Sequence, residues 1–173
     1  MKSTGMIRKI DELGRIVIPK EIRNNLKIKD NEAVEIYVEE DKMILQKYNQ
    51  MLSYEDKCNK LINIFDKVFN LNIIITDTSK VLFLSKNCDS KFLNNEITKE
   101  FQNLIKERKI IINKEIENLK WLKNNDIKSC TVLFPILKNT ELLGAVFLIS
   151  DKKISDYEVA IVRLFSLLIK SFE

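Results

Sequence analysis

The residues whose types and spacing suggest a chemical function are the lysines and arginines near the start of the sequence. Residues 1–29 contain eight lysines and arginines but only three acidic residues. Residues 30–48 contain two lysines and six acidic residues. This separation of charge builds a local positive field, and such a field suits the binding of a polyanion. The four cations that lie beside an apolar run or a turn are Arg8, Lys9, Arg15 and Arg23.

The residues around these cations have the pattern of a β-hairpin. MIRKI (6–10) and RIVI (15–18) are rich in β-branched residues, which predicts two short strands. The segment from Asp11 to Gly14 predicts the turn between them, because glycine adopts a positive φ readily. Pro19 has no backbone donor and ends the second strand, and it suits the first position of a short helix over 20–26.

A second hairpin follows in the sequence. AVEIYV (33–38) alternates apolar and polar residues, as a half-buried strand does, and MILQKY (43–48) predicts its partner strand. The exposed positions of this hairpin are acidic and would repel phosphate, so we expect it to have no functional face. Two hairpins of this length bury little apolar surface alone, and a second chain is the expected source of additional burial.

These residues also carry a family resemblance. MKSTGMIRKIDELGRIVIPKEIR, followed by EIYVEEDKMILQKY, resembles the AbrB-type swapped-hairpin DNA-binding domain of bacterial transition-state regulators over residues 1–48. The resemblance implies a dimer in which two chains interleave their hairpins into one small β-barrel. It also implies that Arg8, Lys9, Arg15 and Arg23 contact DNA. The sequence departs from the family at Asn24, where many members have a second arginine, so the contact set differs there.

Length and composition set the outline of the remainder. The chain has 173 residues, of which 45% are hydrophobic and 31% charged, enough for a small domain and a modest one. We expect a DNA-binding domain over 1–50, a linker over 51–55 and a second domain over 56–173. No apolar run approaches the roughly 20 residues that cross a bilayer, and the N-terminus lacks the apolar core of a signal peptide. The expected location is the cytoplasm, with no membrane partner.

Three cysteines and the absence of histidine exclude several kinds of chemistry. Cys58, Cys88 and Cys130 lie far apart and form no C-x-x-C pair, so we expect no metal site and interpret them as small buried hydrophobes. Without histidine there is no Ser-His or Cys-His nucleophile arrangement. We therefore expect neither an enzyme nor a cofactor.

The C-terminal part of the sequence predicts alternating helices and strands. A helix begins near Ser53, which can cap it, and carries an apolar stripe at helical spacing. LNIIITDTSKVLFLS (71–85) predicts two strands about an Asp-Thr-Ser turn, and Thr98 can cap the next helix. KIIIN (109–113) predicts a short strand, whereas residues 115–129 indicate irregular or partly helical structure.

The last part of the chain predicts a hairpin and a helix. CTVLFPILKNTELLGAVFLIS (130–150) has the pattern of a β-hairpin, in which Pro135 favours an edge or a bulge. Ser155 can cap the final helix. The apolar face of this helix, from Tyr157 to Phe172, is broader than one side of a small sheet needs. We therefore expect helix–helix contact between chains.

The order helix, two strands, helix, strand, hairpin, helix resembles a GAF-like domain, and SCTVLFPILKNTELLGAVFLIS resembles its late hairpin. The resemblance implies an α+β fold with an antiparallel sheet, terminal helices on one face and middle loops over the other. It also implies a site for a small molecule between the sheet and those loops. For the candidate lining residues, ordinary core packing is the preferred interpretation. These residues are Phe83, Ser85, Phe92, Trp121 and Phe134.

Together the two resemblances imply a regulator of sporulation genes, acting as activator and repressor in the developing spore. The expected partners are double-stranded DNA and other copies of the chain, as a homodimer through residues 1–50 and a homotetramer through the C-terminal helices. One alternative is an antitoxin that regulates its own expression, and the long, regularly patterned C-terminal part argues against it. Another is a metabolite sensor with a vestigial DNA-binding head, and the intact arginines argue against that.

Overall fold

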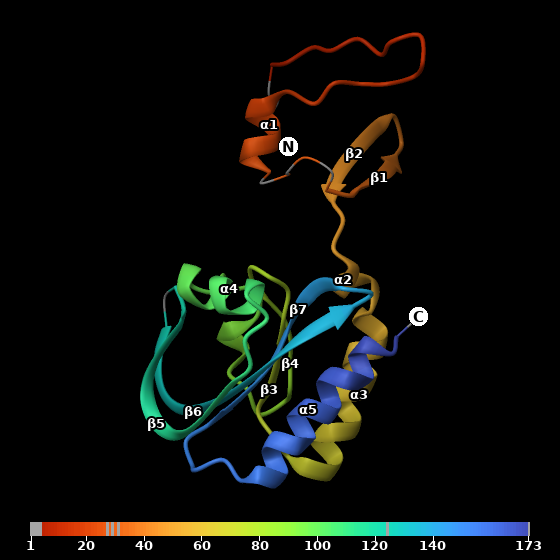
Figure 1. The fold of residues 1–173 in the computed structure, drawn as a ribbon. Helices are drawn as coiled ribbons and strands as arrows, with labels where there is room; N and C mark the ends of the chain where they lie inside the picture. Colours follow the sequence, from red (N-terminus) through yellow and green to blue (C-terminus); the bar gives the residue numbers. More distant parts are fainter. Residues whose placement is uncertain (1–4, 27, 29, 31, 124, 173) are drawn as a thin grey trace. The chain divides into compact units, whose positions relative to one another are not determined.

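The computed structural model describes residues 5–26, 28, 30, 32–123 and 125–172. Contacts within the chain divide it into two compact units, Met1–Tyr48 and Asn49–Glu173. Figure 1 shows the first unit as a long loop, a short helix and a small hairpin, and the second as a sheet with helices on both faces. Lys2, Lys27 and Lys29, counted above among the cations, lie outside the described residues.

The first unit begins with an irregular segment, residues 5–19, that we call the basic arm. The predicted turn is confirmed: the amide of Gly14 donates to the carbonyl of Asp11 at 2.9 Å, and Gly14 has φ +73°. The two predicted strands, 6–10 and 15–18, are wrong, since neither segment is a strand within this arm. A strand needs a ladder partner, and the two sides of the arm meet through a bond from Asp11 N to Arg15 O beside the turn.

A helix and a hairpin complete the first unit. Helix α1 (Lys20–Asn25) follows Pro19, which occupies the N-cap position instead of the predicted first helical position. Strands β1 (Val34–Glu39) and β2 (Lys42–Lys47) pair antiparallel, as predicted, and Glu40 in their turn has φ +53°.

Apolar side chains of the first unit face solvent. Ile7 is 88% exposed, and Val38, predicted to lie on a half-buried face, is 77% exposed. On the same face of the hairpin, Ile36 pairs with Leu45 and is also exposed. The period-2 pattern is therefore present in β1, but nothing within the described chain covers its apolar face.

The second unit is built on a five-stranded antiparallel sheet with the order β4-β3-β7-β6-β5. Two longer helices lie against one face, and a shorter helix and a 3-10 turn lie against the other (Figure 1). This arrangement confirms the predicted GAF-like architecture. The elements are β3 (Ile73–Thr76), β4 (Val81–Leu84), β5 (Ile111–Leu122), β6 (Asn125–Lys138), β7 (Glu141–Ser150), α3 (Glu55–Phe69), α5 (Asp156–Lys170), α4 (Lys99–Lys106) and η1 (Ser90–Phe92).

Each face of the sheet has its own hydrophobic core. Between the sheet and helices α3 and α5, the rings of Phe65 and Phe165 pack edge to face, with their centroids 4.7 Å apart. On the other face, below α4 and η1, Trp121 packs against Phe92 and Phe147, with ring centroids 5.4 and 5.6 Å apart. Such aromatic pairs stabilise by about 1 kcal/mol beyond the area that they bury.

The segment predicted as a linker, 51–55, contains the end of one helix, a turn at Tyr54 and the first residue of the next helix. Helix α2 (Gln50–Ser53) is capped by Asn49, whose side-chain oxygen accepts from the amide of Met51, and α3 follows at Glu55. Ser53 does not cap α3, because it is the last residue of α2 and its hydroxyl donates to the carbonyl of Gln50. Met51 is fully buried in the core under α3 and α5, which explains why this segment is ordered.

Strand β5 corrects the interpretation of residues 115–129. Residues 115–122 form the end of β5 and residues 125–129 the beginning of β6, and the two strands pair antiparallel with irregular register between Asn113 and Glu117. The polar sequence of β5 gives no strand pattern, because this strand forms through its pairing with β6. β6 is an internal strand, and Pro135 pairs with Ala145 of β7 beside a register shift; it lies beyond the end of the pairing with β5, so its missing donor leaves that ladder intact.

Apart from Ser53, the predicted caps of the second unit are confirmed, and so is its predicted turn. Thr98 caps α4, and Ser155 forms a capping box with Glu158 at the start of α5. In the Asp-Thr-Ser turn, the Asp77 carboxylate accepts hydrogen bonds from the amides of Ser79 and Lys80. Each contact is local in the sequence, which is why residue types alone indicate it.

Candidate nucleic-acid interface

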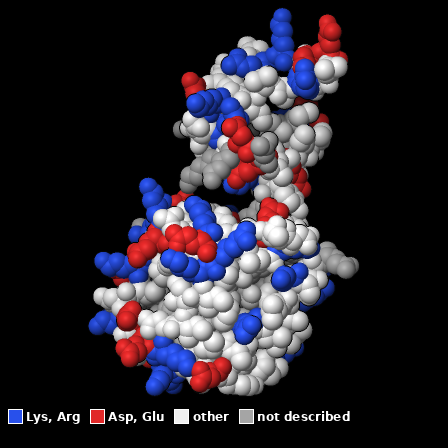
Figure 2. Space-filling model, in the orientation of Figure 1, with Lys and Arg blue, Asp and Glu red and all other residues white. Residues whose placement is uncertain are grey.

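The four predicted DNA-contacting cations lie on consecutive parts of the first unit. Arg8 and Lys9 lie on the outgoing side of the basic arm, Arg15 follows its turn, and Arg23 lies in helix α1. The first three are exposed and Arg23 is half-buried. Figure 2 shows lysine and arginine side chains interspersed with acidic ones on this unit, so the positive surface is divided by carboxylates.

Arg15 is held by the turn that precedes it. Its Nε donates to Oδ2 of Asp11 at 2.8 Å, and its amide donates to Oδ1 of the same carboxylate, also at 2.8 Å. The side chain of Arg15 is nevertheless 70% exposed. These bonds from Arg15 to the carboxylate lower the pKa of Asp11, so that the pair is fully charged at neutral pH.

Arg23 is paired in a different way. Its Nη1 contacts Oδ1 of Asp30, and its Nε is buried without a hydrogen-bond partner among the described residues. The Asp30 side chain is almost fully exposed, so the pair sits at the surface, where ion pairs contribute little to stability. A phosphate could therefore replace Asp30 at Arg23.

Arg8 and Lys9 have no acidic partner among the residues that the structure describes. Nη1 of Arg8 donates to the carbonyl of Ile7 at 3.1 Å, and Lys9 makes no hydrogen bond or ion pair there. All four side chains are thus able to contact an anion. Arginine in particular can bind a phosphate or the edge of a guanine with two parallel hydrogen bonds.

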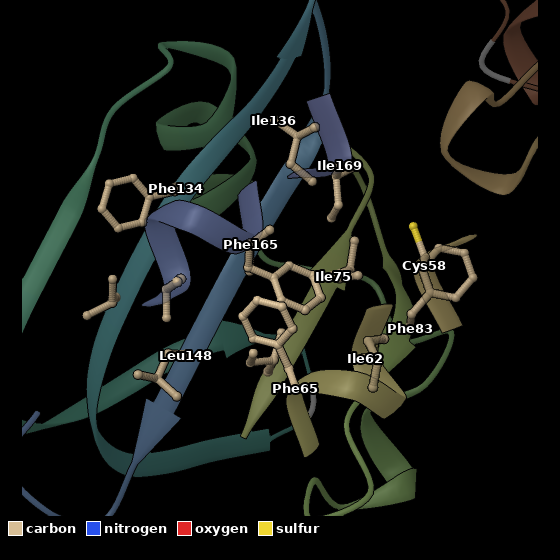
Figure 3. Close-up of a cluster of buried hydrophobic side chains, with 14 of the residues drawn as sticks. Cys58, Ile62, Phe65, Ile75, Phe83, Phe134, Ile136, Leu148, Phe165 and Ile169 are labelled. Carbon is tan, nitrogen blue, oxygen red and sulfur yellow. The ribbon is translucent and has the colours of Figure 1, made fainter. Parts of the chain in front are cut away.

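The five predicted ligand-lining residues do not form one pocket. Phe83 and Phe134 belong to the core between the sheet and helices α3 and α5, where Figure 3 shows both side chains. Phe92 and Trp121 lie in the core on the opposite face. Ser85 is buried at the end of β4, and its hydroxyl accepts from the amide of Ile73 at 2.9 Å.

Trp121 fills the core below α4 and η1. It is fully buried, and among the described residues its Nε1 has no hydrogen-bond partner. Its contacts with Phe92 and Phe147 explain the presence of an indole in this polar stretch without a ligand.

A hollow of about 330 Å³ lies beside this core, between α4 and strands β5 and β6. The buried Thr131 contributes to its lining, and the Thr131 hydroxyl has no partner among the described residues. Sequence reasoning missed this place, because residues 115–129 gave no strand signal that would have set α4 over β5. Its other lining residues include Glu100, Phe101, Leu104, Asn113 and Lys120.

The cysteines are placed as ordinary packing residues. Cys58 and Cys130 are buried, Cys88 is partly buried, and none forms a disulfide. Burial raises the pKa of Cys58 to about 12, so its thiol is protonated at neutral pH. In the described part of the chain, no three His, Cys, Asp or Glu residues are grouped so as to hold a metal ion, and no helix is long and apolar enough to cross a membrane.

Comparison with protein-family models divides the chain in two. Residues 54–169 match the model described as "Stage V sporulation protein T C-terminal, transcription factor". Residues 7–53 match the model described as "Antidote-toxin recognition MazE, bacterial antitoxin".

Two curated proteins of Bacillus subtilis (strain 168) are similar to this chain. Stage V sporulation protein T is 30% identical over 162 residues, which cover 91% of this chain and 90% of that protein. The transition state regulatory protein AbrB is 40% identical over 104 residues, covering 60% of this chain and 97% of AbrB.

Two solved structures extend the comparison. The N-terminal DNA recognition domain of Bacillus subtilis AbrB is 59% identical, with a TM-score of 0.25, and the match covers 28% of this chain and 92% of that domain. The cofactor-binding GAF domain of the nutrient sensor CodY from Clostridium difficile is 16% identical, with a TM-score of 0.44, over 72% of this chain and 97% of that domain.

An AbrB-like head with an exposed arginine-bearing turn, followed by a five-stranded sheet with helices on both faces that matches a transcription-factor model, defines a class of two-domain transcription regulators. The family model covers most of the second unit, and the full-length similarity extends over both units. The chain belongs to the stage V sporulation protein T family of transcription factors.

Proposed function

We propose that this protein regulates sporulation genes by binding double-stranded DNA through the basic arm and helix α1. The observation that carries the proposal is the exposed guanidinium of Arg15 at the turn of the arm, with Arg8 and Lys9 nearby in sequence and Arg23 on α1. The protein acts as an activator at some promoters and a repressor at others. It works in the cytoplasm on the nucleoid of the developing spore.

The four cations serve two kinds of contact. Most neutralise phosphates and fix the position of the protein on the duplex, while guanidinium groups also reach base edges in the major groove. Selection among many promoters then depends on DNA shape and bendability as well as on base contacts.

The proposed binding unit is a homodimer formed through residues 1–50. Exposed apolar side chains in both the basic arm and β1, such as Ile7 and Val38, support this proposal, because a second chain would bury them. Interleaved arms would also allow segments 6–10 and 15–18 to form the strands that neither segment forms within one chain. In this dimer the four cations become eight.

The C-terminal domain, proposed to span 56–173 after a linker over 51–55, assembles two dimers into a tetramer. Helices α3 and α5 lie side by side, since Phe69 of α3 meets the ring of Tyr157 in α5 at 6.2 Å. Both helices expose large apolar side chains that a helix–helix contact would bury. These side chains are Ile64, Val68, Tyr157, Leu164 and Leu167.

A small molecule that modulates this unit is proposed to bind beside α4. The hollow there combines apolar walls, the charged side chains of Glu100 and Lys120, and the Thr131 hydroxyl, which has no partner in the described part of the chain. It is a better candidate than the five residues predicted from the sequence, because those residues lie on both faces of the sheet. The test is a thermal-shift screen of small molecules on the full chain and on its Thr131→Val variant. A compound that binds in the hollow should raise the melting temperature of the full chain more than that of the variant.

The DNA proposal is tested by fluorescence anisotropy on an AT-rich promoter fragment at low salt. Arg15→Ala should weaken binding at least tenfold, since a charge-assisted contact contributes about 1.5–3 kcal/mol. Lys42→Ala is the matched control: it removes one exposed cation from the acidic hairpin and should leave affinity nearly unchanged. Wild-type protein that fails to bind, or equal effects of both variants, would contradict the proposal.

An antitoxin that controls its own expression is the second candidate, favoured by the family description that residues 7–53 match. The C-terminal part argues against it, because residues 54–169 match a transcription-factor domain and form a packed unit. Deletion of the flanking gene that would encode a toxin distinguishes the two. An antitoxin becomes dispensable after that deletion, whereas a sporulation regulator is still required for spore formation.

A further inference from the structure

The carboxylate of Asp11 makes two separate sets of contacts. Its Oδ1 accepts from the amides of Leu13 at 3.0 Å and Arg15 at 2.8 Å, which closes the turn of the basic arm. Its Oδ2 accepts from Nε of Arg15 at 2.8 Å. One side chain therefore fixes both the backbone that carries Arg15 and the direction of its guanidinium.

The contact through Nε leaves the end of the guanidinium free. Neither Nη of Arg15 has a hydrogen-bond partner among the described residues, and the side chain is mostly exposed. Because a bidentate contact to a phosphate or guanine can use these two nitrogens, the ion pair with Asp11 does not compete with such a contact. Arg23 differs, since its Nη1 is already in contact with Asp30 and must exchange that partner.

Asp11 also places a negative charge at a surface that meets phosphates. That charge disfavours every duplex to a similar extent, whereas a fixed guanidinium favours a duplex whose groups are placed to receive it. A side chain that is ordered before binding also loses less entropy on binding. The two effects together lower non-specific affinity and preserve specific affinity, which raises discrimination.

We propose that Asp11 is a positioning residue for DNA recognition, which holds Arg15 through Nε so that both Nη groups are presented to the duplex. The inference rests on the proposed DNA-binding function. It assigns to the DELGR turn a role in choosing targets, beyond its role in joining the two sides of the arm.

Asp11→Asn is the informative variant. An asparagine oxygen can still accept the two amides of the turn, but its charge is lost and its attraction for Nε of Arg15 is weak. Asp11→Ala removes both sets of contacts and serves as the comparison for loss of the turn. Circular dichroism and mass measurement of the full chain check that Asp11→Asn retains the fold and the oligomer of the wild type.

The measurement is the ratio of affinities for an AT-rich promoter fragment and a GC-rich duplex of equal length, in one buffer. We expect Asp11→Asn to reduce this ratio about fivefold, a typical coupling between residues in contact, mainly through tighter binding of the GC-rich duplex. In an Arg15→Ala background the same substitution should leave the ratio unchanged, because Asp11 acts through Arg15.

Two results would overturn the inference. One is an unchanged ratio in Asp11→Asn, and the other is an equal reduction with and without Arg15, which would assign the effect to the turn or to net charge. Failure of the proposed function gives a different result, because wild-type protein would then bind neither duplex.

Discussion

Replacing Gly144 by alanine is expected to destabilise the second unit, because Gly144 lies against the backbone of a neighbouring strand. An added Cβ would lie 1.9 Å from the carbonyl oxygen of Thr76, where ordinary contacts exceed 3 Å. Strand β7 pairs with β3 next to this point, through Ala145 and Thr76. The alanine can fit only if the two strands separate by about 1 Å, and overpacking of this kind costs about 1–3 kcal/mol.

Urea denaturation followed by tryptophan fluorescence measures this loss of stability specifically in the second unit. Trp121 is the single tryptophan of the chain and is fully buried in the second unit. With a urea dependence of about 2 kcal/mol per molar, the midpoint should fall by roughly 0.5–1.5 M.

Gly14→Ala is the matched control for this experiment. A Cβ at Gly14 meets no atom within 4 Å, and the residue lies in the first unit, so the Trp121 transition should keep its midpoint. A Gly144→Ala variant that unfolds at the wild-type urea concentration would refute the described packing of β7 against β3.

Three further predictions concern the thiols and the two interfaces. At pH 8 a disulfide reagent should modify Cys88 first and leave Cys58 unreacted in the folded chain. Burial raises the pKa of both thiols, that of Cys58 to about 12, but Cys58 is fully buried whereas Cys88 is partly exposed, so rapid reaction of Cys58 would contradict its burial. Leu164→Asp should convert the proposed tetramer to a dimer in light scattering, and this dimer should still bind DNA. An unchanged mass would show that α5 does not form the proposed interface. Val38→Asp should abolish the dimer and DNA binding together, and a variant that still binds DNA as a dimer would show that β1 is not buried.

Most features of the fold that depend on neighbouring residues were predictable from the sequence, although Ser53 was wrongly predicted to cap a helix. Ser155 and Thr98 cap their helices through amides three residues ahead, and Asp77 closes its turn in the same way. The turn at Gly14 belongs to this group as well. In each case the donor and acceptor lie within a few residues, so residue type and spacing determine the contact.

Features that depend on distant residues were not predictable in this way. The polar strand β5 is regular because β6 pairs with it, a relation that the local pattern of residues 115–129 does not contain. Phe134 and Trp121 were predicted to line one candidate site, but their side chains lie in the cores on opposite faces of the sheet. Segments 6–10 and 15–18 have high β propensity, yet propensity cannot form a strand without a ladder partner.

The candidate DNA interface lies between these two cases. Charge and turn signals identified Arg15 and the segment that carries it, but not the aspartate that orients it. Asp11 and Arg15 are four residues apart, and that separation forms an ion pair here because the turn brings the carboxylate back to Nε. Asp11 was predicted only as part of the turn.

The salt dependence of DNA binding tests the central claim most directly. Eight cations in a dimer predict a slope of log affinity against log salt of about −7, and Arg15→Ala, which removes two of them, predicts roughly −5. A steep wild-type slope that flattens in this variant, with the Lys42→Ala slope unchanged, is the result that our account predicts. A shallow wild-type slope, or equal slopes for wild type and Arg15→Ala, would contradict it.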